Sequence, residues 1–201
     1  MNLAAVIALQ LLVATPQPSA GEHLLAGARA FRDGRFDLAL VEFRVAQSLG
    51  AEDAAPYAAA TLVKLGRSEE AVEAFGSSNP GSDALLDYYR AVACYEARLY
   101  GCADRLLARL GERAGPRVTE QAARMRAAIA LELTNEPPQA SVDWYLARCS
   151  DRRAAGRLGL AAAYCREAAD LAARRQDRYR LAEASSLLAT LPAGQRSGAT
   201  R

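Results

Sequence analysis

The sequence predicts an all-α protein, and three features of its 201 residues support this fold class. Alanine and leucine, which are strong helix formers, together make up more than a third of the chain. Only 8 prolines and 14 glycines interrupt it. In addition, a pattern of glycine, alanine and aromatic residues recurs every 32 residues, which is the separation of Gly34 and Gly66. Such a period is typical of proteins built from stacked helix pairs.

Charge and residue content argue against several classes of function. The chain has 25 basic and 23 acidic residues, so its net charge of +2 produces no general field for nucleic acid. Its one histidine, His23, has no visible catalytic partner around it, and we interpret it as an ordinary helix-face residue. Phosphate-binding GxxxxGK[ST] loops, GxGxxG motifs and GxSxG elbows do not occur. We therefore expect a protein that is not an enzyme and holds no metal or other cofactor.

The N-terminal segment predicts export from the cytoplasm. Residues 1–21 carry no charge, and an apolar run from Leu3 to Ala14 is too short to span about 30 Å of hydrocarbon. Prolines and small residues follow it, so we predict a signal peptide over residues 1–20, cleaved after Ala20, and a periplasmic or secreted protein. No Lys or Arg precedes the run, which is atypical of signal peptides. An uncleaved membrane anchor and a buried first helix are the alternatives.

The repeat itself is clearest between residues 34 and 107. The pairs that align at this spacing are Gly34 with Gly66, Ala39 with Ala71, and Phe43 with Phe75. One further period along the chain, Ala103 and Leu107 continue the pattern, although Arg98 stands where the first two units have glycine. In this register the chain resembles the tetratricopeptide repeat family. Gly27 and Ala46 also fall at positions where that family has small residues.

This resemblance implies a right-handed α-solenoid of about five stacked helix hairpins over residues 21–191. Small residues such as Gly27 and Ala39 then lie where the two helices of a hairpin approach closely. The last two units are irregular: the fourth begins near Gln121, and the first helix of the fifth runs from about Arg152 to Arg175. The polar residues 192–201 are expected to form a disordered tail.

In this family the inner helices line a concave groove that binds protein or peptide. The resemblance carries these groove positions onto Leu24, Phe31, Arg32, Val63, Lys64, Leu85, Tyr88, Val92, Tyr95, Met125 and Ile129. The lysine and asparagine with which some members bind a C-terminal carboxylate are absent, so we expect a ligand with apolar anchors. The helical spacing of Tyr88, Val92 and Tyr95 also suits packing against a neighbouring helix, and both interpretations stay open.

The four cysteines have no CxxC spacing, which argues against zinc or thioredoxin-like chemistry. Cys94 and Cys102 lie four residues either side of Arg98, where we expect a hairpin turn, so at most one disulfide, Cys94–Cys102, is predicted. The alternative is four buried free thiols. Cys149 and Cys165 are not expected to pair, because the predicted helix boundaries separate them.

Basic residues recur at every fourth position at Arg105, Arg109, Arg113 and Arg117. Acidic neighbours favour a solvated helix face over an anion site. The sequence as a whole predicts a non-enzymatic, exported interaction module that binds a peptide or an envelope-assembly partner, with no nucleic acid and no metal. A regulatory or docking subunit of an enzyme and a membrane-anchored adaptor are the alternatives.

Overall fold

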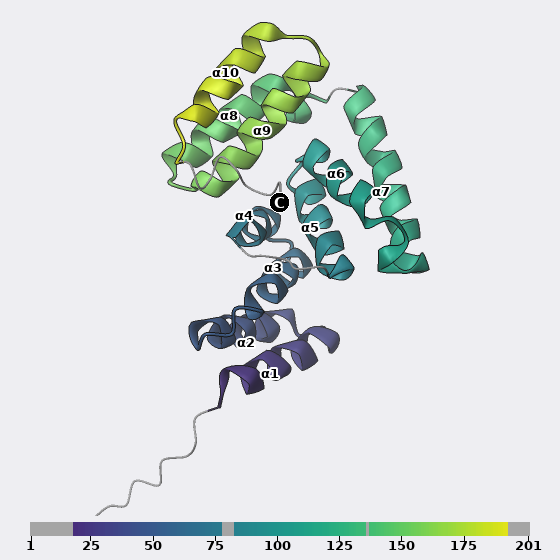
Figure 1. The fold of residues 1–201 in the computed structure, drawn as a ribbon, viewed down its shortest axis with the longest axis vertical. Helices are drawn as coiled ribbons and strands as arrows, with labels where there is room; N and C mark the ends of the chain where they lie inside the picture. Colours follow the sequence, from purple (N-terminus) through teal and green to yellow (C-terminus); the bar gives the residue numbers. More distant parts are fainter. Residues whose placement is uncertain (1–17, 78–82, 136, 193–201) are drawn as a thin grey trace, which may run out of the picture.

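The computed structural model describes residues 18–77, 83–135 and 137–192, and within these ranges the chain is helical and contains no strand (Figure 1). The predicted all-α class is therefore confirmed. The described elements are α1 (Ala20–Arg32), α2 (Phe36–Ser48), α3 (Ala54–Lys64), α4 (Ser68–Ser77), α5 (Ala84–Glu96), α6 (Tyr100–Leu110), the 3₁₀ turn η1 (Gly111–Ala114), α7 (Pro116–Asn135), the 3₁₀ turn η2 (Pro138–Ala140), α8 (Val142–Ala154), α9 (Leu158–Arg174) and α10 (Arg178–Ala189).

The first described helix, α1, begins at the site of the predicted cleavage. The Ser19 hydroxyl accepts a hydrogen bond from the Glu22 N–H, and the Glu22 carboxylate accepts one from the Ser19 N–H at 2.6 Å. This capping box satisfies two backbone donors, and cleavage after Ala20 would remove it. Residues 1–17 of the predicted signal peptide and 193–201 of the predicted tail lie outside the described residues. Among the described helices, none has the length and apolar character needed to cross a bilayer.

The first six helices form three hairpins, α1–α2, α3–α4 and α5–α6, and each hairpin packs on the next (Figure 1). Their turns share one geometry. Gly34, Gly66 and Arg98 have φ values of 75°, 70° and 61°. In each turn the next N–H donates to a carbonyl five residues earlier, as in Leu99 to Cys94 at 2.8 Å. This left-handed ending favours glycine, and the chain uses Arg98 for it in the third hairpin.

Close packing within these hairpins follows the predicted register. A Cβ on Gly27 would lie 2.7 Å from the Phe43 ring, so α1 and α2 approach this closely because residue 27 has no side chain. Ala39, Ala71 and Ala103 each have no exposed surface. The predicted close-approach positions of the first three hairpins are therefore core positions.

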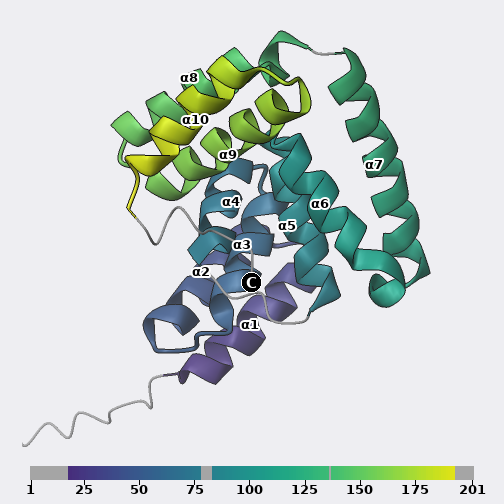
Figure 2. The same ribbon diagram turned by 45° about the horizontal axis from the view of Figure 1, so that its top comes forward.

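The second half differs from the predicted repeats. Helix α7 packs against α6 and α5, whereas α8 pairs with α9, and α10 lies along α9 (Figures 1 and 2). The predicted fourth hairpin and the predicted continuous helix from Arg152 to Arg175 are both wrong. Gly156, with φ of 72°, ends α8, and the Arg157 N–H donates to the Arg152 carbonyl at 2.8 Å. The same turn as in the first hairpins thus interrupts the predicted helix.

Helices α8 and α9 dock on the turn between α5 and α6. The Tyr145 hydroxyl donates to the Arg98 carbonyl at 2.6 Å, and the Tyr164 hydroxyl lies 3.2 Å from the Ala97 carbonyl. The Glu167 carboxylate, 1% exposed, accepts from the N–H groups of Gly101 and Cys102 at the start of α6. Side chains of the C-terminal unit therefore satisfy backbone groups on both sides of this turn.

Ion pairs join the same unit to α4. Arg157 lies 3.2 Å from Glu69 and 3.0 Å from Glu73, and Arg152 lies 2.8 Å from Glu69. All four side chains are about one-quarter to one-third exposed, so water screens these pairs only in part. The C-terminal helices are thus fixed to both the second and the third hairpin.

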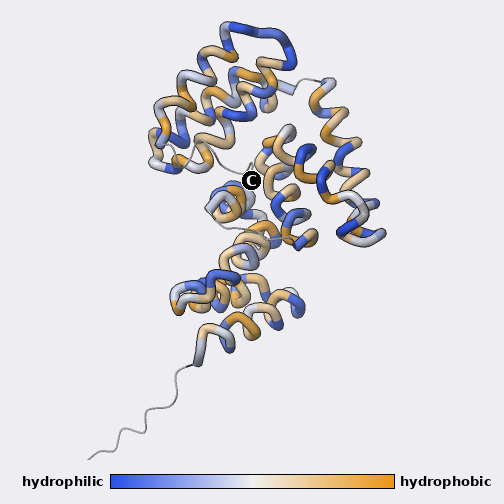
Figure 3. The backbone as a smooth tube through the Cα atoms, in the orientation of Figure 1, coloured by the Kyte–Doolittle hydropathy of each residue, from blue (hydrophilic) through white to orange (hydrophobic). Residues whose placement is uncertain are grey.

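Two hydrophobic cores meet at α5. One core runs from α1 to α5 and includes Ala93, and the other runs from α5 to α10 and includes Ala91 and Cys94. The turn between α9 and α10, outside both cores, is strongly hydrophilic (Figure 3). Because α5 contributes to both cores, it connects the stacked hairpins to the C-terminal unit.

Candidate functional site

Residues of α1, α3 and α5 meet on the side of the stack that the first helix of each hairpin forms, which we call the inner face. The Phe31 ring of α1 and the Tyr89 ring of α5 have centroids 5.9 Å apart and are nearly perpendicular. The Lys64 ammonium of α3 lies 5.4 Å from the Tyr89 centroid, within the range of a cation–π contact, and Tyr88 meets Tyr89 edge-on. We call Phe31, Lys64, Tyr88 and Tyr89 the inner-face cluster. Three of these residues are predicted groove positions, whereas Tyr89 is not among them.

The other predicted groove residues divide by exposure. Arg32 and Leu85 are exposed, with Leu85 at 50%. Leu24, Val92, Tyr95 and Met125 are half-buried against the cores, and the Tyr95 ring contacts the Tyr100 ring. Val63 and Ile129 are core residues, 6% and 1% exposed, and offer almost no surface to a ligand. Packing therefore accounts for a large part of the predicted groove.

Both cysteine pairs form disulfides. Cys94 and Cys102 are joined across the α5–α6 turn with their Cα atoms 6.0 Å apart, the pair that the symmetry about Arg98 favours. Cys149 and Cys165 are joined across the α8–α9 turn at a Cα separation of 5.2 Å. The expectation that this second pair stays apart is wrong. Its basis was the misplaced helix boundary, because Cys149 and Cys165 each lie eight residues from Arg157 in the true turn.

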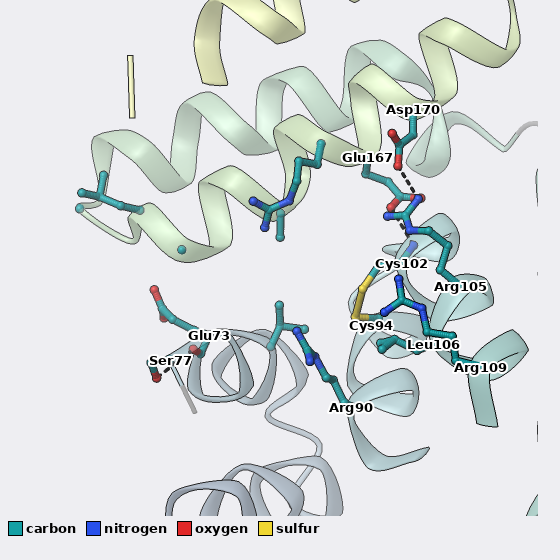
Figure 4. A pocket seen from close by; sticks show the side chains of 17 residues that line it. Glu73, Ser77, Arg90, Cys94, Cys102, Arg105, Leu106, Arg109, Glu167 and Asp170 are labelled. Atoms are coloured by element: carbon teal, nitrogen blue, oxygen red, sulfur yellow. Dashed lines mark hydrogen bonds and ion pairs between the residues drawn. A yellow bond between two sulfur atoms is a disulfide. The ribbon is translucent and has the colours of Figure 1, made fainter. Parts of the chain in front are cut away.

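A cleft of about 750 Å³ lies between the stacked hairpins and α9 (Figure 4). Four arginines from three helices line it: Arg90 of α5, Arg105 and Arg109 of α6, and Arg166 of α9. The regularly spaced arginines that start at Arg105 therefore do not share one environment. Arg105 and Arg109 line this cleft, whereas Arg113 lies 3.8 Å from Asp87. Arg90 and Arg166 could not be found from the sequence because no local pattern relates residues on separate helices.

The lone histidine takes part in a contact between helices. The His23 Nδ1 atom lies 2.7 Å from a Glu42 carboxylate oxygen, which joins α1 to α2 with both side chains about one-fifth exposed. This position agrees with a helix-face role. Within the described ranges, no group of three or more His, Cys, Asp or Glu residues is placed to hold a metal ion.

Comparison with models of known protein families, with curated proteins and with solved structures found no match to this chain.

Proposed function

We propose that the protein is a non-enzymatic, exported scaffold that binds a peptide segment of an envelope partner. The inner-face cluster carries this proposal, because it joins aromatic rings and a cation from three successive first helices of hairpins. An extended peptide can run across those helices and place an apolar side chain against the rings. The exposed Lys64 ammonium then favours a carboxylate beside that anchor.

The proposed fold relationship is a tetratricopeptide-like, right-handed stack limited to the first three hairpins. Its support is the shared turn geometry at Gly34, Gly66 and Arg98 and the full burial of Ala39, Ala71 and Ala103. In the proposal, α8–α10 close the end of this short stack in place of further repeats.

Export is supported by the two disulfides and by the apolar segment at the N-terminus. Disulfides persist in oxidising compartments and are rare in a reducing cytoplasm. Cys94–Cys102 and Cys149–Cys165 together use all four cysteines of the chain. We therefore propose that the mature protein works in the periplasm or outside the cell.

Selection from a displayed peptide library tests the binding function. We expect the protein to enrich peptides with an aromatic or large aliphatic residue next to Asp or Glu. Lys64→Glu should weaken the selected peptides more than tenfold, because it replaces an attraction with a repulsion of like charges. The control is Arg178→Glu, the same charge change at an exposed position at the start of α10. Failure to enrich any motif, or equal weakening by both variants, would contradict the proposal.

A further inference from the structure

The cleft between the hairpins and α9 is walled by both charged and apolar groups. Helices α4, α5 and α6 form one side, and α9 forms the other. In Figure 4 the side chains of Arg90, Arg105 and Arg109 extend into the space between them. Val72, Leu106, Leu158 and the Cys94–Cys102 disulfide supply apolar wall. Its volume of about 750 Å³ falls within the range of small-molecule sites.

The carboxylates of the cleft are already engaged. Asp170 pairs with Arg105, Glu73 pairs with Arg157, and Glu167 accepts two backbone N–H groups of α6. By contrast, the side chains of Arg90 and Arg109 form no hydrogen bond or ion pair with any residue in the described ranges. Arg90 and Arg109 therefore bring positive charge to the cleft that no ion pair with a described residue offsets.

Burial of these positive charges is unfavourable to the folded protein. The pKa of Arg90 is lowered by burial and by the nearby charge of Arg109, although Asp87 opposes this effect. The pKa of Arg166 is lowered by burial and by the charges of Arg105 and Arg90, with Asp170 in opposition. Partly desolvated charges of one sign that line a cleft are typical of binding sites for a ligand of the opposite charge.

We propose that this cleft binds a small organic phosphate, whose phosphate group is held by the guanidinium groups of Arg90 and Arg109. Guanidinium groups bind phosphate and carboxylate in a bidentate manner. Two of them, from two helices, match the three terminal oxygens and double charge of a phosphate monoester better than the two oxygens and single charge of a carboxylate. The apolar wall accommodates the organic part. This site is separate from the inner-face cluster, so the proposal does not depend on peptide binding.

Titration calorimetry of the oxidised full chain tests the site, with phenyl phosphate as the probe. Inorganic phosphate lacks the apolar ring, and benzoate has a carboxylate in place of the phosphate, so the two compounds separate the contributions of these groups. We expect saturable binding of one phenyl phosphate per chain, at least tenfold tighter than either comparison compound. Absence of saturable binding, or equal affinity for benzoate, would overturn the proposal.

Variants locate the binding. Arg90→Gln and Arg109→Gln should each weaken phenyl phosphate at least tenfold, because each removes a charge-assisted contact. Arg124→Gln, an exposed position on α7, should change affinity less than twofold. Without ligand, Arg90→Gln should melt no lower than the wild type, because it removes a charge that burial disfavours, and phenyl phosphate should no longer raise its melting temperature. A lower melting temperature without ligand, or affinity equal to that of Arg124→Gln, would show that Arg90 has a structural role instead.

Discussion

At the scale of single residues, the contact between α1 and α2 depends on the missing side chain of Gly27. A Cβ at this position would lie 2.7 and 2.8 Å from atoms of the Phe43 ring, and Phe43 is itself 2% exposed. The ring cannot withdraw without disturbing the core of α1–α5. This position therefore resists even the smallest enlargement.

Gly27→Ala should lower the free energy of unfolding by about 1–3 kcal/mol, because it overpacks a closed contact. The matched control is Gly76→Ala on α4, where a Cβ would meet nothing within 4 Å. There, higher helix propensity should stabilise the protein by up to about 1 kcal/mol. Urea denaturation of the two variants measures both effects. Similar stability of the two variants would contradict the proposed contact.

The burial of two tyrosines predicts that the free energy of unfolding falls at alkaline pH. Burial raises the pKa of Tyr145 and Tyr164 above the ordinary value near 10, and the charges of Glu167 and Glu69 add to this. Above pH 10 the unfolded chain loses these protons while the folded chain keeps them, so the free energy of unfolding falls as pH rises. Each tyrosine should contribute a slope of about 1.4 kcal/mol per pH unit.

Tyr145→Phe or Tyr164→Phe should remove that share of the slope, at the cost of one hydrogen bond. The control is Tyr179→Phe, because Tyr179 is 75% exposed and should not alter the slope. Stability measured between pH 9 and pH 11 distinguishes these variants. If the slope of Tyr145→Phe equals that of the wild type, this tyrosine is not protected in the folded state.

At the scale of helices, the disulfides clamp two hairpins across their turns. Trypsin places the four cysteines on four different peptides, 91–98, 99–105, 149–152 and 158–166, so their pairing can be determined directly. Non-reducing peptide mapping should recover 91–98 joined to 99–105, and 149–152 joined to 158–166. Reduction should destabilise the protein, because the loop closed by Cys149–Cys165 alone is worth about 3 kcal/mol. Crossed pairs or four free thiols would contradict this helix pairing.

The helices also show which parts of the fold can be predicted from the sequence. Regular spacing of Gly34 and Gly66 was sufficient to place the first three hairpins, because each turn repeats a local backbone requirement. The prediction for the second half is wrong for two reasons. Helix α7 packs on the third hairpin as a single helix, and the turn at Gly156 does not fall at the spacing that Gly34 and Gly66 set. No local pattern indicates that Tyr145 and Glu167 bind the α5–α6 turn, since these contacts join segments 47 and 66 residues apart.

The two candidate sites likewise differ in how well the sequence predicts them. Phe31 and Lys64 could be named from their repeat positions, because the register of α1 and α3 is local. The cleft could not, because Arg90 and Arg166 come together only when α9 packs over α4 and α6. Its position therefore depends on the tertiary contacts that the repeat pattern does not encode.

At the scale of the whole molecule, the structure presents a short stack of hairpins closed by a C-terminal unit. Helix α5 belongs to both cores, carries Tyr88 and Tyr89 of the inner-face cluster, and contributes Arg90 to the cleft. The two proposed sites thus depend on one helix that is fixed from both sides. A helix packed on both sides suits the proposed scaffold role, because binding then requires little ordering of the protein.

Site-specific photo-cross-linking in cells tests peptide binding at the inner face most directly. A benzophenone amino acid replaces Leu85, which is 50% exposed on α5 one turn from Tyr88 and Tyr89, or replaces Tyr179, which is 75% exposed on α10. We predict a discrete cross-linked partner from position 85 but not from position 179, and its loss when Lys64→Glu is added. Equal cross-linking at both positions, or a product unaffected by Lys64→Glu, would contradict the proposed peptide site.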